Sequence, residues 1–94
     1  MAIEALEKRL CLALVYARYQ RVVEVHAIGT TRSGRTVMSA YQVAGQSNSS
    51  PVPGWRMFRL DECLDVALSD IPSQAPRPGY QRGSGQFVTL DAQL

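Results

Sequence analysis

Arginine and aromatic residues are the side chains of this sequence with the clearest capacity for chemistry. The 94-residue chain has nine Arg against one Lys, with four Tyr, two Phe and one Trp, and its formal net charge is +2. Arg is the better planar, bidentate partner for phosphate and carboxylate, and it stacks on bases. Guanidinium groups beside aromatic rings are what a nucleotide or a single-stranded nucleic acid needs. A GC-rich genome raises Arg content as well, so composition alone does not assign this function.

The stretch Gly54–Asp61 concentrates these side chains, because it holds the single Trp, one of the Phe and two of the Arg. Successive side chains of a strand point to opposite faces, so Trp55 and Arg56 face opposite ways. We therefore expect a strand with a packed apolar body and guanidinium groups at its edges. The sequence leaves open which of its faces is buried.

Neighbouring strands are expected to bring further basic and aromatic residues beside this stretch, with Arg21 among them. The candidate binding surface for a nucleotide or nucleic acid is His26, Arg35, Tyr41, Arg56 and Arg59. The alternative places Trp55 and Phe58 in the core and pairs the Arg side chains with acidic residues. Those acidic residues are Glu24, Asp61 and Asp65. Both hold in part if the apolar face is buried while the Arg tips stay free.

No pattern typical of an enzyme is present. His26 is the single His, and catalysis would require a nucleophile or carboxylate partner that no recognised motif supplies. Cys11 and Cys63 lack the spacing of a zinc site, and we expect both to be reduced, with Cys11 in the core. We expect no catalytic residue, no metal and no cofactor.

Length and composition predict one small domain. Hydrophobic residues make up 46% and charged residues 19%, which is ordinary for a globular chain. No apolar run is long enough to cross a membrane, and no signal peptide is recognisable. We therefore expect a soluble, cytoplasmic protein without membrane contact.

Hydrophobic spacing predicts one helix followed by about five short strands. The helix is expected over residues 3–12, the strands over 12–16, 21–29, 35–44, 54–60 and 64–69, and a Ser-rich loop over 45–53. In strand 21–29, alternation places Val25 and Ala27 on one face and His26 and Ile28 on the other. Residues 1–70 are thus expected to be mainly β with an N-terminal helix, and a barrel would leave no exposed edge.

The composition changes at residue 71. Three Pro and three Gly fall between residues 71 and 85, which predicts an extended C-terminal arm over residues 71–94. The arm docks on the barrel, reaches a neighbouring subunit or moves freely. The apolar stretch Phe87–Leu90 favours docking at its far end.

Several short motifs occur in this sequence in the same order as in a known protein family. They are His26, Ala40-Tyr41-Gln42, the serines at 47, 49 and 50, Gly54–Asp61, and Pro76–Tyr80. With them, roughly residues 3–80 resemble small stand-alone bacterial proteins related to WYL domains. The Trp-Tyr-Leu triplet itself is absent, and Glu62 stands where the family usually has Arg.

The resemblance implies a small SH3/Sm-like, five-stranded antiparallel barrel with an N-terminal helix. It also implies a non-enzymatic regulatory module that senses a nucleotide or single-stranded nucleic acid through basic and aromatic residues. No helix-turn-helix accompanies it, so operator DNA is not expected to be read in that way. The alternative function is a self-associating structural or interaction module, a homo-oligomer that exchanges its arm between subunits.

Overall fold

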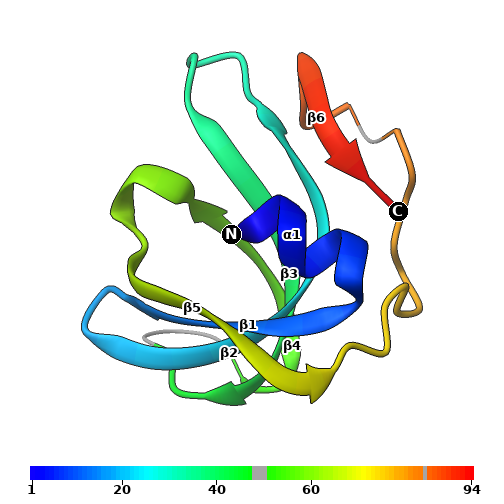
Figure 1. Cartoon of the computed structure of the whole chain (residues 1–94). Coiled ribbons are helices and arrows are strands. Elements are labelled where there is room, and N and C mark those ends of the chain that lie inside the picture. The colour runs from blue at the N-terminus through cyan, green and yellow to red at the C-terminus, as the bar shows by residue number, and fades with distance from the viewer. Residues whose placement is uncertain (48–50, 84) are drawn as a thin grey trace.

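Figure 1 shows the computed structural model of the chain, in which a six-stranded sheet packs against one short helix. The structure describes residues 1–47, 51–83 and 85–94. Residues 48–50 of the predicted loop, which include two of its motif serines, and Ser84 of the arm lie outside that part. The strands are β1 (Leu10–Tyr16), β2 (Tyr19–Thr30), β3 (Thr36–Gly45), β4 (Gly54–Arg59), β5 (Leu64–Pro72) and β6 (Thr89–Gln93). The prediction of a mainly β chain with an N-terminal helix is confirmed.

The helix α1 (Ala2–Lys8) is shorter than the predicted one. Arg9 takes the left-handed conformation, φ 58° and ψ 45°, which ends the helix, and β1 begins at the next residue. The apolar run after Arg9 serves as a strand between β2 and β5 rather than as more helix. The helix buries Ala5 and Leu6, whereas Ile3 is 42% exposed.

The strands form one antiparallel sheet in the order β4–β3–β2–β1–β5, and β6 pairs with β2. At twelve residues, β2 is long enough for its first part to pair with β1 and its last four residues to pair with β6. Within the described residues, the end strands β4 and β5 do not pair with each other, so the sheet is not closed. The prediction of five strands missed β6, which the C-terminal arm supplies.

A β-bulge in the middle of β2 changes which side chains face the core. Val25 pairs with Ala40 of β3, but Ala27 pairs with the adjacent Ser39, so β2 has one extra residue at His26. Simple alternation placed Ile28 with His26. Because of the bulge, Ile28 instead joins Val25 in the core, and Ala27 turns to the opposite side.

The core lies between one face of the sheet and α1. Its buried members are Ala2, Ala5, Leu6, Leu12, Leu14, Val23, Val25, Ile28, Met38, Ala40 and Phe58. The opposite side of β2, β3 and β4, here called the outer face, carries Glu24, His26, Tyr41 and Trp55. Residues 73–83, here called the strap, contact this outer face through hydrogen bonds and ring contacts. In Figure 1 the strap runs from the end of β5 (yellow) towards β6 (red).

Two short turns connect neighbouring strands of the sheet. A 3-10 turn, η1 (Leu60–Glu62), follows β4 and leads into β5. The predicted hairpin between residues 21–29 and 35–44 is confirmed, with Thr30 opposite Thr36 and Gly34 at φ 82° in the turn. No helix within the described residues is long and apolar enough to cross a membrane.

Candidate ligand-binding site

The structure does not gather the predicted basic residues into one surface. Arg35 Nη1 lies 3.1 Å from Asp61 Oδ2, and Arg59 Nη1 lies 3.4 Å from Glu62 Oε2. All four side chains are about half exposed, so solvent screens these pairs. Each guanidinium is thus paired with a nearby carboxylate. Asp61 is one of the acidic residues that the alternative interpretation expected to pair with an Arg side chain.

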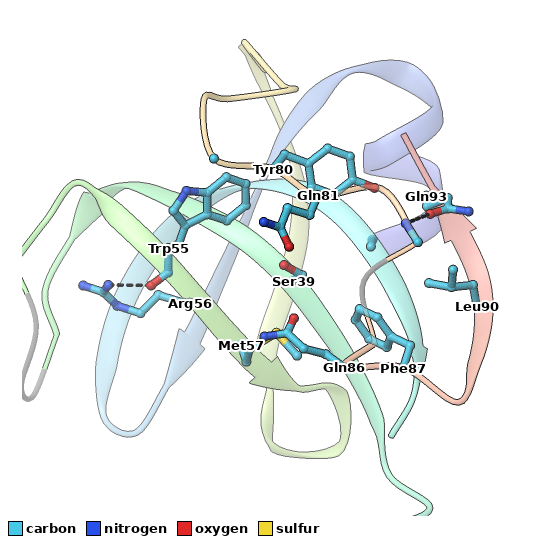
Figure 2. Close-up of a pocket in the computed structure, with 13 residues that line it drawn as sticks. Ser39, Trp55, Arg56, Met57, Tyr80, Gln81, Gln86, Phe87, Leu90 and Gln93 are labelled. Atoms are coloured by element: carbon cyan, nitrogen blue, oxygen red, sulfur yellow. Dashed lines mark hydrogen bonds between the residues drawn. The ribbon is translucent and has the colours of Figure 1, made fainter. Parts of the chain in front are cut away.

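Arg56 belongs to the other face of β4, together with the core residue Phe58. Its Nη2 donates to Pro51 O at 2.8 Å, and its Nη1 donates to Trp55 O at 2.9 Å. Figure 2 shows the guanidinium directed away from the pocket described below. Arg56 therefore holds the chain that enters β4.

Arg21 also lies on the core side, where it is 5% exposed. Its Nε and Nη2 donate to Tyr16 O at 3.2 and 3.0 Å, and its Nη1 donates to Gln42 Oε1 at 3.3 Å. The rings of Tyr16 and Phe58 lie within 5.6 Å of the guanidinium carbon. Burial lowers the Arg21 pKa, and the charge of Arg56 acts in the same direction. The position of Arg21 makes it a structural residue.

The aromatic half of the predicted surface does assemble. His26 is fully buried, with its ring centroid 4.6 Å from that of Trp55 and 5.1 Å from that of Tyr80. The Tyr41 and Trp55 rings meet edge to face at 5.5 Å. Tyr80 comes from the strap, and it was not among the candidate residues although its motif was recognised. The rings therefore form a cluster between the outer face and the strap.

A buried ion pair fastens the strap beside this cluster. Glu24 is 1% exposed, and its carboxylate accepts from Arg77 Nε at 2.6 Å, Arg77 Nη2 at 3.2 Å and the Gln74 backbone N–H at 2.6 Å. Burial raises the pKa of Glu24, but these hydrogen bonds and the Arg77 charge outweigh it, so the pKa is lowered. The Arg77 guanidinium also lies 4.9 Å from the centroid of the Tyr41 ring.

Both ring nitrogens of His26 have partners. Nε2 accepts the backbone N–H of Arg77 at 3.0 Å, and Nδ1 lies 2.9 Å from Glu24 O. A carbonyl can only accept, so we assign the proton to Nδ1 and a neutral ring. Burial lowers the pKa of His26, and this outweighs the opposing effects of Glu24. His26 thus acts as a fixed link between β2 and the strap.

A pocket of about 260 Å³ opens beside the ring cluster (Figure 2). Its lining comprises Ala27, Ser39, Trp55, Arg56, Met57, Gly79, Tyr80, Gln81, Gly83, Gln86, Phe87, Leu90 and Gln93. Apart from Arg56, whose charged end is directed elsewhere, these residues are neutral. The site offers apolar and aromatic walls with hydroxyl and amide groups between them.

Two glycines permit this arrangement. A Cβ on Gly29 of β2 would lie 2.3 Å from Thr89 O and 2.8 Å from the Phe87 ring, so a side chain there would exclude β6. Gly79 has φ +93°, and a Cβ there would lie 3.2 Å from Trp55 Nε1.

The sequence signal for the pocket was the apolar stretch at Phe87, which indicated docking of the arm. Nothing in the sequence pointed to the three glutamines of the lining, Gln81, Gln86 and Gln93.

The described residues include no group of three or more His, Cys, Asp and Glu placed to hold a metal ion. Cys11 and Cys63 are free, as expected. Compared with known proteins, the chain matches no family model, no curated protein and no solved structure.

Proposed function

We propose that this chain is a non-enzymatic binding module that holds the base of a nucleotide, or of single-stranded nucleic acid, in the pocket between the outer face and the arm. The observation that carries the proposal is the lining, which combines the Trp55 and Phe87 rings with the Ser39 hydroxyl and three Gln amides. Stacking of a base on an aromatic ring contributes about 1–3 kcal/mol. Amide side chains bind base edges through paired donor and acceptor groups.

The small volume of the pocket suits a single base, and its almost entirely neutral lining favours a base over a phosphate. Its volume of about 260 Å³ lies below the ~300–1,000 Å³ typical of pockets for drug-sized ligands. Cationic donors make the strongest hydrogen bonds to phosphate, and Arg35 and Arg59 are already paired with carboxylates at the far end of β4. In this proposal the base enters the pocket and the phosphate stays outside it. We also propose that the open sheet is a variant of the SH3/Sm-like barrel that the WYL resemblance implies.

Titration of adenosine, adenosine monophosphate and a short oligonucleotide, followed by the fluorescence of Trp55, tests the function. We expect the nucleoside to bind about as well as the nucleotide, with little change between low and high salt. A basic surface would instead give affinity that falls steeply with salt. The proposal fails if none of the three ligands binds at neutral pH and low salt.

Gln81 provides a matched variant for this test. Its side chain lines the pocket and makes no hydrogen bond to another described residue, so Gln81→Ala should leave the fold intact. Loss of one hydrogen bond should weaken binding by about 2- to 10-fold. Gln20→Ala, the same change on an exposed residue outside this pocket, and Arg35→Ala with Arg59→Ala should leave the affinity unchanged.

Self-association is the second candidate function, and we propose that the chain forms a homo-oligomer. The strand β5 lies at one end of the sheet order, with Leu64 60% and Ile71 48% exposed. An edge strand with exposed apolar side chains is a template for pairing with a second copy. Light scattering of the protein and of the double variant Leu64→Glu, Ile71→Glu tests this, because a monomeric parent excludes it.

A further inference from the structure

The strap is attached to the outer face at two titratable residues that water does not reach. Glu24 is 1% and His26 is 0% exposed. Between them they accept hydrogen bonds from four donors of residues 74–77, two of the backbone and two of the Arg77 side chain. We propose that this attachment is a proton-sensitive latch: protonation of His26, and at lower pH of Glu24, releases the strap from the outer face and opens the pocket. The effect on ligand affinity rests on the proposed function, but the release of the strap does not.

The geometry of His26 makes the docked strap incompatible with a charged ring. Nδ1 faces Glu24 O at 2.9 Å, and Nε2 accepts the Arg77 N–H at 3.0 Å. A second proton would have to occupy Nε2, where it would meet the N–H of Arg77. Two donors cannot bond each other, so the ring, the backbone amide or both would have to move. Protonation therefore removes one attachment of the strap.

The groups around His26 come from each element packed against it. Its own strand contributes Glu24, and β4 contributes the uncharged Trp55 ring. The strap contributes Tyr80 and Arg77, whose guanidinium lies between the Glu24 carboxylate and the Tyr41 ring of β3. The Leu94 N–H donates to the backbone oxygen of His26 at 3.0 Å. Glu24 is the acidic side chain of this set that would stabilise an imidazolium, and it is already engaged by Arg77.

Glu24 provides the second attachment. Its two oxygens accept hydrogen bonds from Arg77 and from the Gln74 backbone. Burial raises the pKa of the Cys11 thiol, and the charge of Glu24 acts in the same direction. Protonation of the carboxylate would remove its charge and one of its acceptor positions, which weakens the charge-assisted bonds. The Arg77 side chain would then be held at the outer face only by weaker hydrogen bonds and by its contact with the Tyr41 ring.

The two shifts have the same sign. The pKa of His26 is lowered from 6.5, chiefly by burial. The pKa of Glu24 is lowered from 4.5, because Arg77 and Gln74 outweigh burial. In both cases the side chain of β2 binds the proton more readily when the strap is released than when it is docked. Docking is therefore complete above pH 6.5, weakens as the pH falls below that value, and weakens further below pH 4.5.

Release of the strap would open the pocket without unfolding the sheet. The strap supplies Gly79, Tyr80, Gln81 and Gly83 to the lining. Among the described residues, the bond from Trp55 Nε1 to Pro78 O at 3.3 Å would still join the strap to the outer face. The ends of the strap would stay attached, through Ser73 to Arg9 and through Tyr80, Arg82 and Gly83 to Gln93 and Leu94. The strand β6 pairs with residues 27–30 of β2 through backbone groups that do not titrate. The middle of the strap would thus move away from Trp55, while the wall formed by Phe87 and Leu90 stays in place.

Hydrogen exchange of the Gln74 and Arg77 amides, followed by NMR from pH 7.5 to 4 and corrected for the intrinsic rates, tests the latch. We expect protection to fall by up to about tenfold per pH unit once His26 begins to titrate, since one proton is taken up on release. The ring signals of His26 in the same samples give its own titration. Unchanged protection of both amides across the range in which His26 becomes charged would overturn the proposal.

His26→Gln is the matched variant, because its amide oxygen accepts the Arg77 N–H but does not titrate. We expect its strap to stay protected until the pH falls below 4.5. Loss of protection at the same pH as the parent would overturn the role of His26. If the variant does not dock its strap at pH 7.5, the titration of the parent decides alone. Adenosine binding, measured separately at pH 7.5 and 5.5, distinguishes the proposals. Binding at neither pH contradicts the proposed function, whatever the strap does. Binding at pH 7.5, together with a strap that stays docked after His26 has become charged, contradicts the latch and leaves the proposed function in place.

Discussion

Arg77 holds the carboxylate of Glu24 with two hydrogen bonds, of 2.6 and 3.2 Å, across 53 positions of the sequence. Glu24 is almost fully buried, whereas the Arg77 side chain is 26% exposed. The pair thus joins a central strand to the strap, and it neutralises a carboxylate that burial would otherwise penalise. This relationship, rather than the exposed Arg residues of β4, is the main electrostatic feature of the outer face.

Removal of one partner should therefore be costly. Arg77→Met would leave the Glu24 carboxylate buried without its cation, and we expect a loss of about 2–3 kcal/mol in the free energy of unfolding. This is below the ~3–5 kcal/mol typical of fully buried pairs, because solvent reaches part of Arg77. Urea unfolding at pH 7.5 measures the change. Arg82→Met, on an exposed neighbour in the strap, is the control and should cost well under half as much.

A double variant separates the pair from its burial cost. Glu24→Leu combined with Arg77→Met replaces the ions by apolar groups, which is often near neutral in stability. We expect the double variant to be more stable than Arg77→Met alone. Equal stability of the two would show that the Glu24 charge is not what the single substitution leaves unpaired.

The two faces of β4 should respond differently to truncation. Phe58 is 1% exposed and meets the Tyr16 ring edge to face at 4.9 Å, so Phe58→Ala should cost about 3–5 kcal/mol. Met57, its neighbour on the outer face, is 38% exposed, and Met57→Ala should cost less than about 1 kcal/mol. Thermal unfolding of both variants checks this contrast. A similar cost for the two would contradict the assignment of faces.

The strand pattern was predictable from the sequence because period-2 alternation and turn residues are local signals. The hairpin of β2 and β3 and its turn at Gly34 follow from them. Alternation alone was not enough at residue 26, because the bulge shifts the pattern and moves Ile28 into the core. It also left open which face of β4 is buried, since Trp55 and Phe58 are both large and apolar.

The candidate site was predictable only in its aromatic part. His26, Tyr41 and Trp55 come together because β2, β3 and β4 are neighbours, which the hairpin pattern indicates. The partners of the charged residues depend on contacts distant in the sequence. Arg77 reaches Glu24 only because the strap crosses the outer face, and no local pattern encodes that path. The same holds for β6, whose pairing with β2 places Phe87 at the pocket.

The Cys63 thiol should react slowly with alkylating agents. Burial raises its pKa to about 11, and the carboxylates of Asp61 and Glu62 act in the same direction. At pH 8 about one thiol in a thousand would be ionised, and the thiolate is the reactive form. In a Cys11→Ala background, we expect alkylation by iodoacetamide to be at least 100-fold slower in the folded protein than in urea, as measured by mass spectrometry. Asp61→Asn should speed the folded-state reaction. A folded rate within tenfold of the unfolded one would contradict the burial of this thiol.

Gly29 should control the docking of β6. An alanine Cβ would lie 2.3 Å from Thr89 O and 3.2 Å from Leu90 Cα, which are backbone atoms that cannot rotate away. Since the clash is confined to this pairing, Gly29→Ala should displace β6 and the Phe87 ring while the β1–β5 sheet stays folded, at a cost of about 1–3 kcal/mol. Hydrogen exchange should show faster exchange in residues 89–93 and little change in β3. Gly85→Ala, where a Cβ meets nothing within 4 Å, is the control and should leave both regions unchanged. Because Phe87 lines the pocket, Gly29→Ala should also abolish ligand binding, and intact binding with a displaced β6 would show that the ligand sits elsewhere.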